Sequence, residues 1–222
     1  MNSDEEQRAL QTEKTLVAWQ ASAQYWDKYR DVIRRLFAPL TAALIEEAQI
    51  SAGKNVLDIG GGSGEPSLTI SEIVGPTGSV TFTDPVAGMV ETTQAEASRQ
   101  GLTNIQFRQC SADRLPFADG SFDAAVGRLS VMFFPDPGGA LREALRVVRH
   151  DGLVSFVVWS AEEANPFFTS VNDAIDKFVE SPPEDPDAPD AFRFAEPGKL
   201  AGILEKAGGS DVVSLLRRSA AA

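Results

Sequence analysis

The spacing of hydrophobic positions changes character near residue 54. Before this point, apolar residues recur at spacings of three and four, which is the period of an amphipathic helix. These residues are Val32, Ile33, Leu36, Phe37, Leu40, Leu44, Ile45 and Ala48. Pro39 interrupts the run, so we expect a kink or the start of a second helix there. The first fifty residues are therefore predicted to be helical.

From residue 54 onward, short apolar runs alternate with amphipathic stretches. The apolar runs predict strands at 55–59, 79–83, 105–110, 122–127 and 153–159. Helices are predicted between them, from Pro66 to Gly75, over 86–99 and over 139–148, with a turn at Asp151-Gly152 before the last strand. Strands that alternate with helices indicate an α/β fold, with a doubly wound, mostly parallel sheet flanked by helices.

Residues 160–199 interrupt this alternation. The stretch 167–179 is predicted to be a helix that packs over the edge of the sheet, and SPPEDPDAPD at 181–190 is predicted to be an exposed, extended loop. A final helix is expected over 197–207. An insertion after the fifth strand lies near the ligand-binding end of such a sheet, so a lid and a surface excursion without a role both remain open.

Composition excludes several kinds of site. The 222 residues include one Cys and one His, which rules out an internal disulfide, a thiolate metal cage and a histidine metal cluster. Any Ser-His-Asp scheme would depend on His150, which precedes the predicted turn and is expected to be structural. Cys110 is expected to be a small core residue rather than a nucleophile. No metal site is predicted.

The net charge of −12 bears on partners and on location. An acidic surface repels phosphate backbones and anionic membranes, so neither nucleic acid nor a membrane is expected as a partner. The N-terminal MNSDEEQRALQTEK is acidic where a signal peptide would be basic, and no apolar segment follows it. The apolar run at 153–159 is far too short to span a membrane. A cytoplasmic protein is expected.

Polar residues follow four of the predicted strands at their carboxyl ends. They are Asp58 with Gly60, Gly61, Gly62 and Gly64 for the first strand, Asp84 for the second, Asp113 for the third and Arg128 for the fourth. Open α/β sheets bind ligands outside the carboxyl ends of their strands. We therefore expect these features to meet in one crevice.

The glycine-rich turn identifies the kind of ligand. The only Gly-Lys pair nearby, Gly53-Lys54, precedes the strand, so the pattern of a phosphate loop is not met. In a dinucleotide fingerprint starting at Gly60, the third glycine would fall on Glu65. That carboxylate would sit where a pyrophosphate should bind. Asp58 and Glu65 instead suit a ligand that carries positive charge.

These segments resemble the class I S-adenosylmethionine-dependent methyltransferases, and within them the small-molecule branch that includes the ubiquinone/menaquinone C-methyltransferases. The matching segments are VLDIGGGSGEPS (56–67), TFTDP (81–85), SADRLPFADGSFDAAVGR (111–128) and LREALRVVRHDGLV (141–154). The resemblance covers roughly residues 20–208. It implies one methyltransferase domain over 1–222, with a helical cap (1–50), a cofactor-binding core (51–160), a lid-like insertion (161–199) and a terminal helix with a short end (200–222).

The resemblance implies S-adenosylmethionine as cofactor and a role for each residue of the crevice. Asp58 would hold the loop and face the methionine ammonium, directly or through water, while Gly60, Gly61 and Gly62 lie along the methionine. Asp84, followed by Pro85, would accept both ribose hydroxyls. Asp113 would accept the adenine amino group, Ala112 would give a backbone contact, and Met89 would line the ring. Arg128 is also counted with the cofactor-binding residues.

The acceptor side of the site is expected to be an apolar pocket formed by the 160–199 insertion and the N-terminal aromatics, which are Trp19, Tyr25, Trp26 and Tyr29. Trp26-Asp27 stands where many members of the resembling families have Tyr-Asp. The implied reaction is in-line methyl transfer to a small-molecule acceptor, giving S-adenosylhomocysteine. No residue is identified as a general base.

Alternatives remain open at this point. Asp84 would in one interpretation only cap the helix after Pro85, Asp113 would be an ordinary loop acid, and Arg128 would pair with an acid such as Asp136. At the level of function, the alternatives are a non-catalytic S-adenosylmethionine-binding or partner subunit and an NAD-dependent oxidoreductase. The second of these conflicts with Asp58 and Glu65.

The C-terminal strands are expected to be incomplete. Members of the resembling families finish with two more strands, whereas thirteen residues follow Gly209 here and supply at most one. The sheet would then show an unpaired edge, which folded proteins normally cover. A homodimer is expected on this ground.

Overall fold

The computed structural model describes residues 3–178 and 187–217. Its centre is a five-stranded, fully parallel sheet of order β3-β2-β1-β4-β5. The strands are β1 (Asn55–Ile59), β2 (Ser79–Asp84), β3 (Ile105–Gln109), β4 (Phe122–Arg128) and β5 (Val148–Val157). The predicted α/β fold is confirmed, with every predicted strand present.

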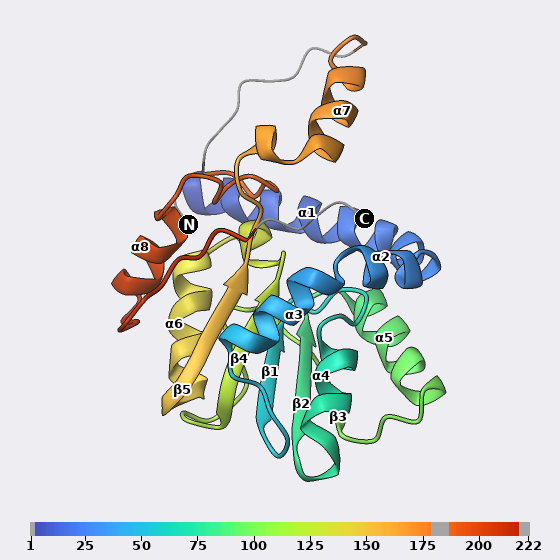
Figure 1. The fold of residues 1–222 in the computed structure, drawn as a ribbon. Coiled ribbons are helices and arrows are strands. Elements are labelled where there is room, and N and C mark those ends of the chain that lie inside the picture. The colour runs from blue at the N-terminus through green and yellow to red at the C-terminus, as the bar shows by residue number, and fades with distance from the viewer. Residues whose placement is uncertain (1–2, 179–186, 218–222) are drawn as a thin grey trace.

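Helices cover both faces of the sheet (Figure 1). They are α3 (Ala38–Glu47), α4 (Ser67–Val74), α5 (Ala87–Arg99), α6 (Pro137–Val147) and α8 (Lys199–Lys206), with short 3-10 turns at 75–77, 131–133 and 162–164. As predicted, Gly75 caps the end of α4, and Pro66 immediately precedes its first residue.

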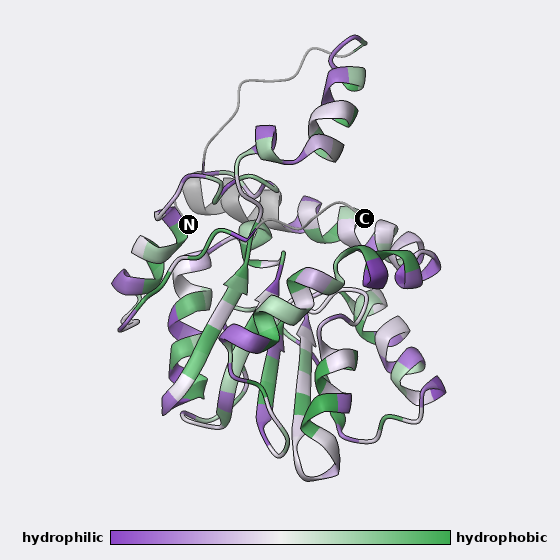
Figure 2. Ribbon diagram, in the orientation of Figure 1, coloured by the Kyte–Doolittle hydropathy of each residue, from purple (hydrophilic) through white to green (hydrophobic). Residues whose placement is uncertain are grey.

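Successive side chains of a strand point to opposite faces of the sheet, and both faces are covered here. In β1, Val56 packs with α3 and α4 in one core cluster, and its neighbour Leu57 packs with α6 in another. Both side chains are completely buried. Strands buried on both faces read as continuous apolar runs, and Figure 2 shows hydrophobic colour along β1 and β5. This explains why the strand positions were visible in the sequence.

The N-terminal helices form a cap at the carboxyl end of the sheet. α1 (Ser3–Lys28) crosses above the ends of the strands in Figure 1, and α2 (Arg30–Leu36) links it to α3. α3 begins at Ala38 and has Pro39 in its first turn, as predicted. The cap thus roofs the end of the sheet where the polar residues were expected to meet. No helix of the described residues is long and apolar enough to cross a membrane.

The start of β5 differs from the prediction. β5 begins at Val148, and the predicted turn at Asp151-Gly152 is an irregularity inside the strand. The pairing jumps there from Phe122↔Val148 to Ala124↔Leu153. A Cβ on Gly152 would lie 2.6 Å from the carbonyl oxygen of Asp123, so this position needs a residue without a side chain. The glycine marks a bulge rather than a turn.

The insertion also differs from the prediction. Its helix, α7 (Pro166–Ile175), projects beyond the carboxyl end of β5 and does not pack over the edge of the sheet (Figure 1). Val179 and residues 181–186 of the predicted helix and loop lie outside the described residues. In the described part of the C-terminal end, 212–217 form no strand.

Candidate cofactor-binding site

A cavity of about 320 Å³ opens where the strands end beneath the cap. The residues that follow β1, β2, β3 and β4 all contribute to its wall, as do residues of α1 and of the α2–α3 junction. Asp84, Asp113 and Arg128 line it, together with Gly60, Gly61, Gly62, Pro85, Met89 and Ala112. The structure therefore brings together nearly all residues predicted for the site. Among the residues predicted to bind the cofactor, the exception is Asp58, which lies behind the wall.

The glycine-rich loop fits closely against the end of β2. The amides of Gly60 and Gly61 donate to the carbonyl of Thr83, at 2.9 and 3.0 Å. Gly60 has a φ of +72°, and a Cβ on Gly61 would overlap the ring of Phe82 and lie 2.8 Å from Asp58 Oδ2. Side chains are thus excluded at both positions, and backbone forms the cavity wall.

Asp58 is completely buried behind Gly61. Its Oδ2 accepts a hydrogen bond from the Ser67 hydroxyl at 2.6 Å, and its Oδ1 has no hydrogen-bond partner among the described residues. Burial raises the pKa of Asp58 to about 7, although Ser67 and Arg128 oppose the shift and Asp84 adds to it. The carboxyl therefore lies directly behind the glycine loop and is bonded to Ser67, the first residue of α4.

Asp84 ties the end of β2 to the glycine loop. Its Oδ2 accepts from the Gly62 amide at 3.0 Å, and its Oδ1 accepts from the Val86 amide at 2.9 Å. Desolvation raises the pKa of Asp84 to about 6 against these two hydrogen bonds. The bond to Val86, the N-cap residue of α5, is the capping role that the alternative interpretation gave it. A carboxylate has about four lone-pair sites, so acceptor capacity remains for a ligand.

Residues after β3 form the opposite wall. Asp113 accepts a hydrogen bond from the Ser111 hydroxyl and lines the cavity beside Ala112. Cys110 lines it as well and packs against the core beneath. Burial raises the pKa of the Cys110 thiol to about 11, so the thiol stays protonated at neutral pH. This state does not suit a nucleophile.

Arg128 enters the cavity from the end of β4. Its Nη1 donates to Thr41 Oγ1 at 2.8 Å, and its guanidinium lies 5.6 Å from the ring centroid of Phe37. Burial lowers the pKa of Arg128, and the charges of Glu65 and Asp58 oppose that shift. No ion pair joins Arg128 to Asp136 among the described residues; Asp136 pairs with Arg142 at 3.9 Å and accepts from the Gly139 amide at the start of α6.

Glu65 is a cavity residue that the sequence analysis noted without including it in the site. It is 5% exposed and lines the wall. Neither of its carboxylate oxygens accepts a hydrogen bond from a described residue. Arg34 Nε lies 3.2 Å from Glu65 Oε1 and forms an ion pair with it. Its position directly after Gly64 of the glycine-rich loop was the feature of the sequence that pointed to Glu65 as a site residue.

The structure divides the predicted aromatics into two pairs. Trp19 and Trp26 line the cavity, and Trp19 also packs against Phe133 with ring centroids 5.2 Å apart. Tyr25 and Tyr29 are 59% and 49% exposed and are not among the residues that line the cavity. Trp19 and Trp26 are seven residues apart, which is close to two helical turns and puts them on one face. Tyr25 is rotated about 100° away from that face.

The insertion reaches the cavity only indirectly. None of its described residues, 161–178 and 187–199, lines the wall. Arg193 Nη1 donates to the carbonyl of Phe134 at 2.7 Å, and Phe194 is buried against Val131 and Met132. The described part of the insertion therefore supports one wall from behind, and a lid role for the insertion stays a prediction.

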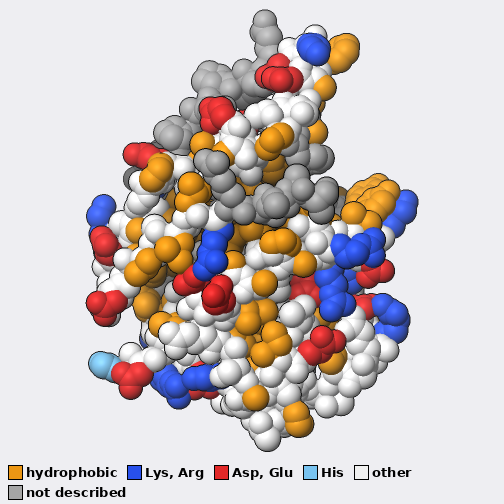
Figure 3. Space-filling model, in the orientation of Figure 1, with side chains coloured by type: hydrophobic (Ala, Val, Ile, Leu, Met, Phe, Trp, Pro, Cys, Tyr) orange, Lys and Arg blue, Asp and Glu red, His pale blue; other side chains and the backbone are white. Residues whose placement is uncertain are grey.

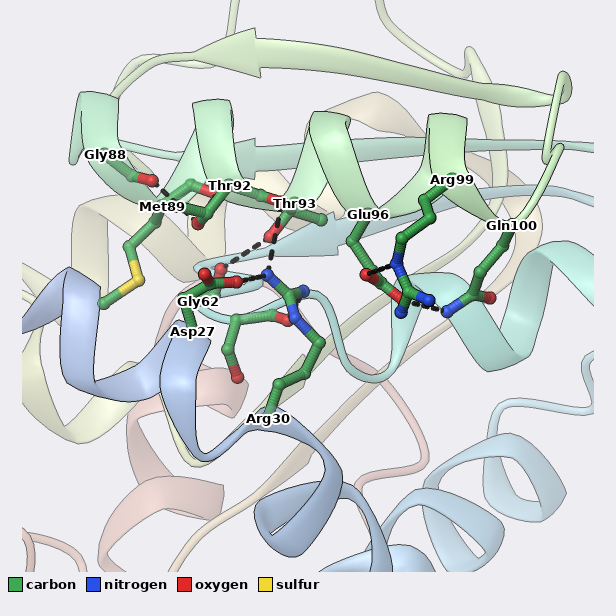
Figure 4. A network of polar contacts seen from close by, with 11 residues as sticks. Asp27, Arg30, Gly62, Gly88, Met89, Thr92, Thr93, Glu96, Arg99 and Gln100 are labelled. Carbon is green, nitrogen blue, oxygen red and sulfur yellow. Dashed lines mark hydrogen bonds and ion pairs between the residues drawn. The ribbon is translucent and has the colours of Figure 1, made fainter.

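Arg30 joins the cap to the glycine loop (Figure 4). Its side chain donates to the carbonyl of Ser63, to the carbonyl of Thr92 at 3.2 Å and to Asp27 Oδ1 at 2.5 Å. Thr93 of α5 donates to the Gly62 carbonyl at 3.1 Å. The loop is thus held from β2, from α5 and from Arg30 of α2. Lys and Arg side chains are also grouped on the surface of the molecule near α2 (Figure 3).

Comparisons with known proteins agree with this geometry. Residues 57–156 match the family model described as a methyltransferase domain. Aklanonic acid methyltransferase DauC of Streptomyces sp. (strain C5) is 36% identical over 120 residues, which cover 54% of each chain. Ubiquinone/menaquinone biosynthesis C-methyltransferase UbiE of Hahella chejuensis is 34% identical over 142 residues, which cover 64% of this chain and 55% of the relative.

A solved structure shows the same fold. The S-adenosylmethionine-dependent methyltransferase of Aquifex aeolicus superposes with a TM-score of 0.57 at 21% identity, covering 76% of this chain and 78% of that one. The chain spans about half the length of the curated relatives that it matches. The family match over residues 57–156, the relatives and the fold agree with the loop, the acids and the cavity, and together they support a class I methyltransferase domain with S-adenosylmethionine as its cofactor.

Proposed function

We propose that the protein transfers a methyl group from S-adenosylmethionine to an apolar small molecule. One observation carries the proposal: the glycine loop and its acids share a single cavity with an aromatic wall supplied by the cap. A cofactor and an acceptor placed there would lie side by side, as methyl transfer requires.

The charges of the cavity fit this cofactor. Its described wall includes the acids Glu65, Asp84, Asp113 and Asp136 and a single basic residue, Arg128. Such a wall disfavours phosphate groups and favours a ligand with an ammonium and a sulfonium. The buried Asp58 Oδ1 accepts no hydrogen bond from a described residue, so a cationic ligand in front of the loop would favour the ionised form of this carboxyl.

Each residue then has a defined task towards the cofactor. Asp84 accepts the ribose hydroxyls with the capacity left beside Gly62 and Val86, and Asp113 accepts the adenine amino group next to the backbone of Ala112. Met89, which is 3% exposed, packs along the adenine ring. When bound, the sulfonium supplies an activated methyl group with a neutral leaving group. The protein is thus required mainly to orient the reactants and to exclude water.

The acceptor side of the cavity is apolar. Leu16, Trp19, Phe37, Phe133 and Phe134 belong to its wall. Two relatives are named after small molecules or their biosynthesis: aklanonic acid in one case and ubiquinone/menaquinone biosynthesis in the other. The net charge of −12 counts against a nucleic-acid acceptor, and we propose a cytoplasmic location for the reaction.

Calorimetry and a methyl-transfer assay test the proposal in two stages. Titration with S-adenosylmethionine, S-adenosylhomocysteine and NAD is expected to show binding of the first two only. A panel of hydrophobic aromatic acceptors is then incubated with methyl-labelled S-adenosylmethionine, and label is expected in an extractable product. Binding of NAD alone would contradict the cofactor. Cofactor binding without transfer to any of a broad acceptor panel would favour the non-catalytic alternative.

A further inference from the structure

The cation in the cavity wall has hydrogen-bonding capacity that the protein does not use. Arg128 is the sole Lys or Arg among the described residues of the wall. Its side chain donates one hydrogen bond within the described part of the chain, from Nη1 to the Thr41 hydroxyl, whereas a guanidinium has five N–H donors. Burial lowers the pKa of Arg128, because the charged form is poorly solvated there. Such a cation favours an anionic ligand.

Arg128 forms no ion pair with any residue that the structure describes. The charges of Glu65 and Asp58 favour its protonated form, but both acids have their contacts elsewhere. Glu65 Oε1 pairs with Arg34 Nε at 3.2 Å, and Asp58 Oδ2 accepts from the Ser67 hydroxyl at 2.6 Å. Buried charges in proteins are normally paired. The partner that the guanidinium lacks is therefore left for a ligand to supply.

Both side-chain contacts of Arg128 lie in the cap. Thr41 belongs to α3, and Phe37, whose ring centroid is 5.6 Å from the guanidinium, stands at the α2–α3 junction and lines the cavity. Phe37 packs edge-on against Trp159 with ring centroids 5.7 Å apart, and Trp159 packs against Phe168 of α7 at 5.3 Å. A row of aromatic rings thus holds Phe37 in place, and Phe37 restricts the orientation of the guanidinium.

The acids of the wall do not compete for this place. Asp84 and Asp113 follow β2 and β3, and the proposed function assigns both to the cofactor. Asp136 accepts from the Gly139 amide at 2.8 Å and pairs with Arg142. The described wall residues that the cap contributes carry no charge, and they are Thr15, Leu16, Trp19, Trp26 and Phe37. A molecule beneath the cap therefore meets an apolar surface with one cation beside it.

We propose that the methyl acceptor is an aromatic molecule with a carboxylate, and that Arg128 binds this carboxylate while the aromatic wall binds the rest of the molecule. A planar guanidinium matches a carboxylate with two parallel N–H···O bonds. The inference rests on the proposed function, and it assigns Arg128 to the acceptor. The cofactor carries a carboxylate as well, so the experiment has to distinguish these two sources.

Calorimetry with a matched pair of probes tests the inference. Cinnamate and cinnamamide have the same aromatic body, and only the first is charged. Both are titrated into protein saturated with S-adenosylhomocysteine, for wild type, Arg128→Gln, Arg128→Lys and the control Arg35→Gln. Arg35 is an exposed arginine of α2, so its replacement removes the same charge from the surface of the cap. Titration with S-adenosylhomocysteine alone measures the cofactor affinity of each variant.

Wild type is expected to bind cinnamate about tenfold or more tightly than cinnamamide, because hydrogen bonds between two charged groups are the stronger ones. Arg128→Gln is expected to abolish this preference through loss of cinnamate affinity. Arg128→Lys is expected to keep part of it, since an ammonium retains the charge without the planar pair of donors. Arg35→Gln should keep all of it. Every variant should bind S-adenosylhomocysteine within about twofold of wild type.

Three results would overturn the inference. The first is wild type that binds S-adenosylhomocysteine but shows no preference for cinnamate, which leaves the proposed function standing. The second is a preference that survives in Arg128→Gln. The third is a loss of about tenfold in S-adenosylhomocysteine affinity in Arg128→Gln, since the guanidinium would then hold the cofactor's carboxylate. Circular dichroism checks that each variant is folded, and Arg128→Lys carries the comparison if Arg128→Gln is not. Wild type that fails to bind S-adenosylhomocysteine would refute the proposed function itself, and this inference with it.

Discussion

The burial of Asp58 and Asp84 beside the cavity disfavours the ionised form of both carboxyls. Both are almost completely buried, and burial is the largest cause of their raised pKa values, about 7 and about 6. A cationic ligand favours the charged carboxylates and offsets part of the free-energy cost of their desolvation. Cofactor binding is therefore linked to the loss of protons from these groups.

This linkage predicts a pH dependence of affinity. Asp58 must lose its proton when the ligand's positive charges arrive, so S-adenosylmethionine should bind about tenfold more tightly at about pH 8 than at about pH 6. Ser67, Arg128 and Asp84 are the groups that act on Asp58, and none of the three is expected to reverse the sign. Calorimetry across this range measures the slope. Affinity that stays level, or that falls with rising pH, would count against the linkage.

The ligand-free protein should show the opposite trend in stability. A raised carboxyl pKa means that the folded state retains a proton that the unfolded chain has lost. The contribution to stability is thus full below pH 3.8, the ordinary pKa of an aspartate, and is lost as the pH rises through about 7. Urea unfolding at a series of pH values is the measurement, with Asp58→Asn as the control in which the slope becomes shallower. An unaltered slope in that variant would exclude Asp58 as its origin.

Asp84→Ala is predicted to weaken cofactor binding about tenfold or more. The variant loses the acceptor for the ribose hydroxyls and also releases the amides of Gly62 and Val86, and hydrogen bonds to a charged group are worth about 1.5–3 kcal/mol. Calorimetry with S-adenosylhomocysteine measures the effect. Unchanged affinity would remove Asp84 from the cofactor site.

At the scale of elements, the cap is fastened to the glycine loop mainly through α2. Arg30 and Arg34 lie one helical turn apart. Arg30 donates a hydrogen bond to the carbonyl of Ser63, and Arg34 forms an ion pair with Glu65. Gln20 of α1 adds a contact to α5, since its Oε1 accepts from the Gly88 amide at 3.1 Å. Side-chain contacts therefore join the N-terminal cap both to the glycine loop and to α5.

Arg30→Met is predicted to destabilise the fold by about 2 kcal/mol. The substitution keeps an apolar stem but leaves the carbonyls of Ser63 and Thr92 without their donor, and an unsatisfied buried acceptor costs about 1–3 kcal/mol. Arg35→Met on the same helix is the control, because Arg35 is exposed and surface substitutions usually stay within about 0.5 kcal/mol. Equal unfolding midpoints for the two variants in urea would show that the contact is not stabilising.

The strands and the residues at their carboxyl ends show which features of the fold and of the site could be predicted from the sequence. Strands buried on both faces leave continuous apolar runs, and residues at their carboxyl ends converge in any parallel sheet, so Asp84, Asp113 and Arg128 were predictable. Glu65 directly follows the glycines and so had a local signal, whereas Phe37 depends on the tertiary position of the cap, which local patterns do not encode. Tyr25 and Tyr29 cluster with the tryptophans along the chain but differ from them in helical phase. A bulge has the same local signature as a turn, so the sequence at Gly152 does not distinguish the two.

At the scale of the whole molecule, the sheet has two edges, at β3 and β5, each paired on one side only within the described residues. Unpaired edges are normally covered, and Val213, Leu215 and Leu216 of the C-terminal end add exposed apolar surface. We propose a homodimer on these grounds. Light scattering at micromolar concentration is expected to give twice the mass of the chain, and a monomer mass would refute it.

The central claim is that this cavity is the cofactor site, and a crystal structure with S-adenosylhomocysteine tests it most directly. The account predicts the ribose hydroxyls on Asp84 and the adenine amino group on Asp113, with the sulfur facing the aromatic wall. Density for the ligand outside this cavity, or with its adenine away from Asp113, would contradict the account.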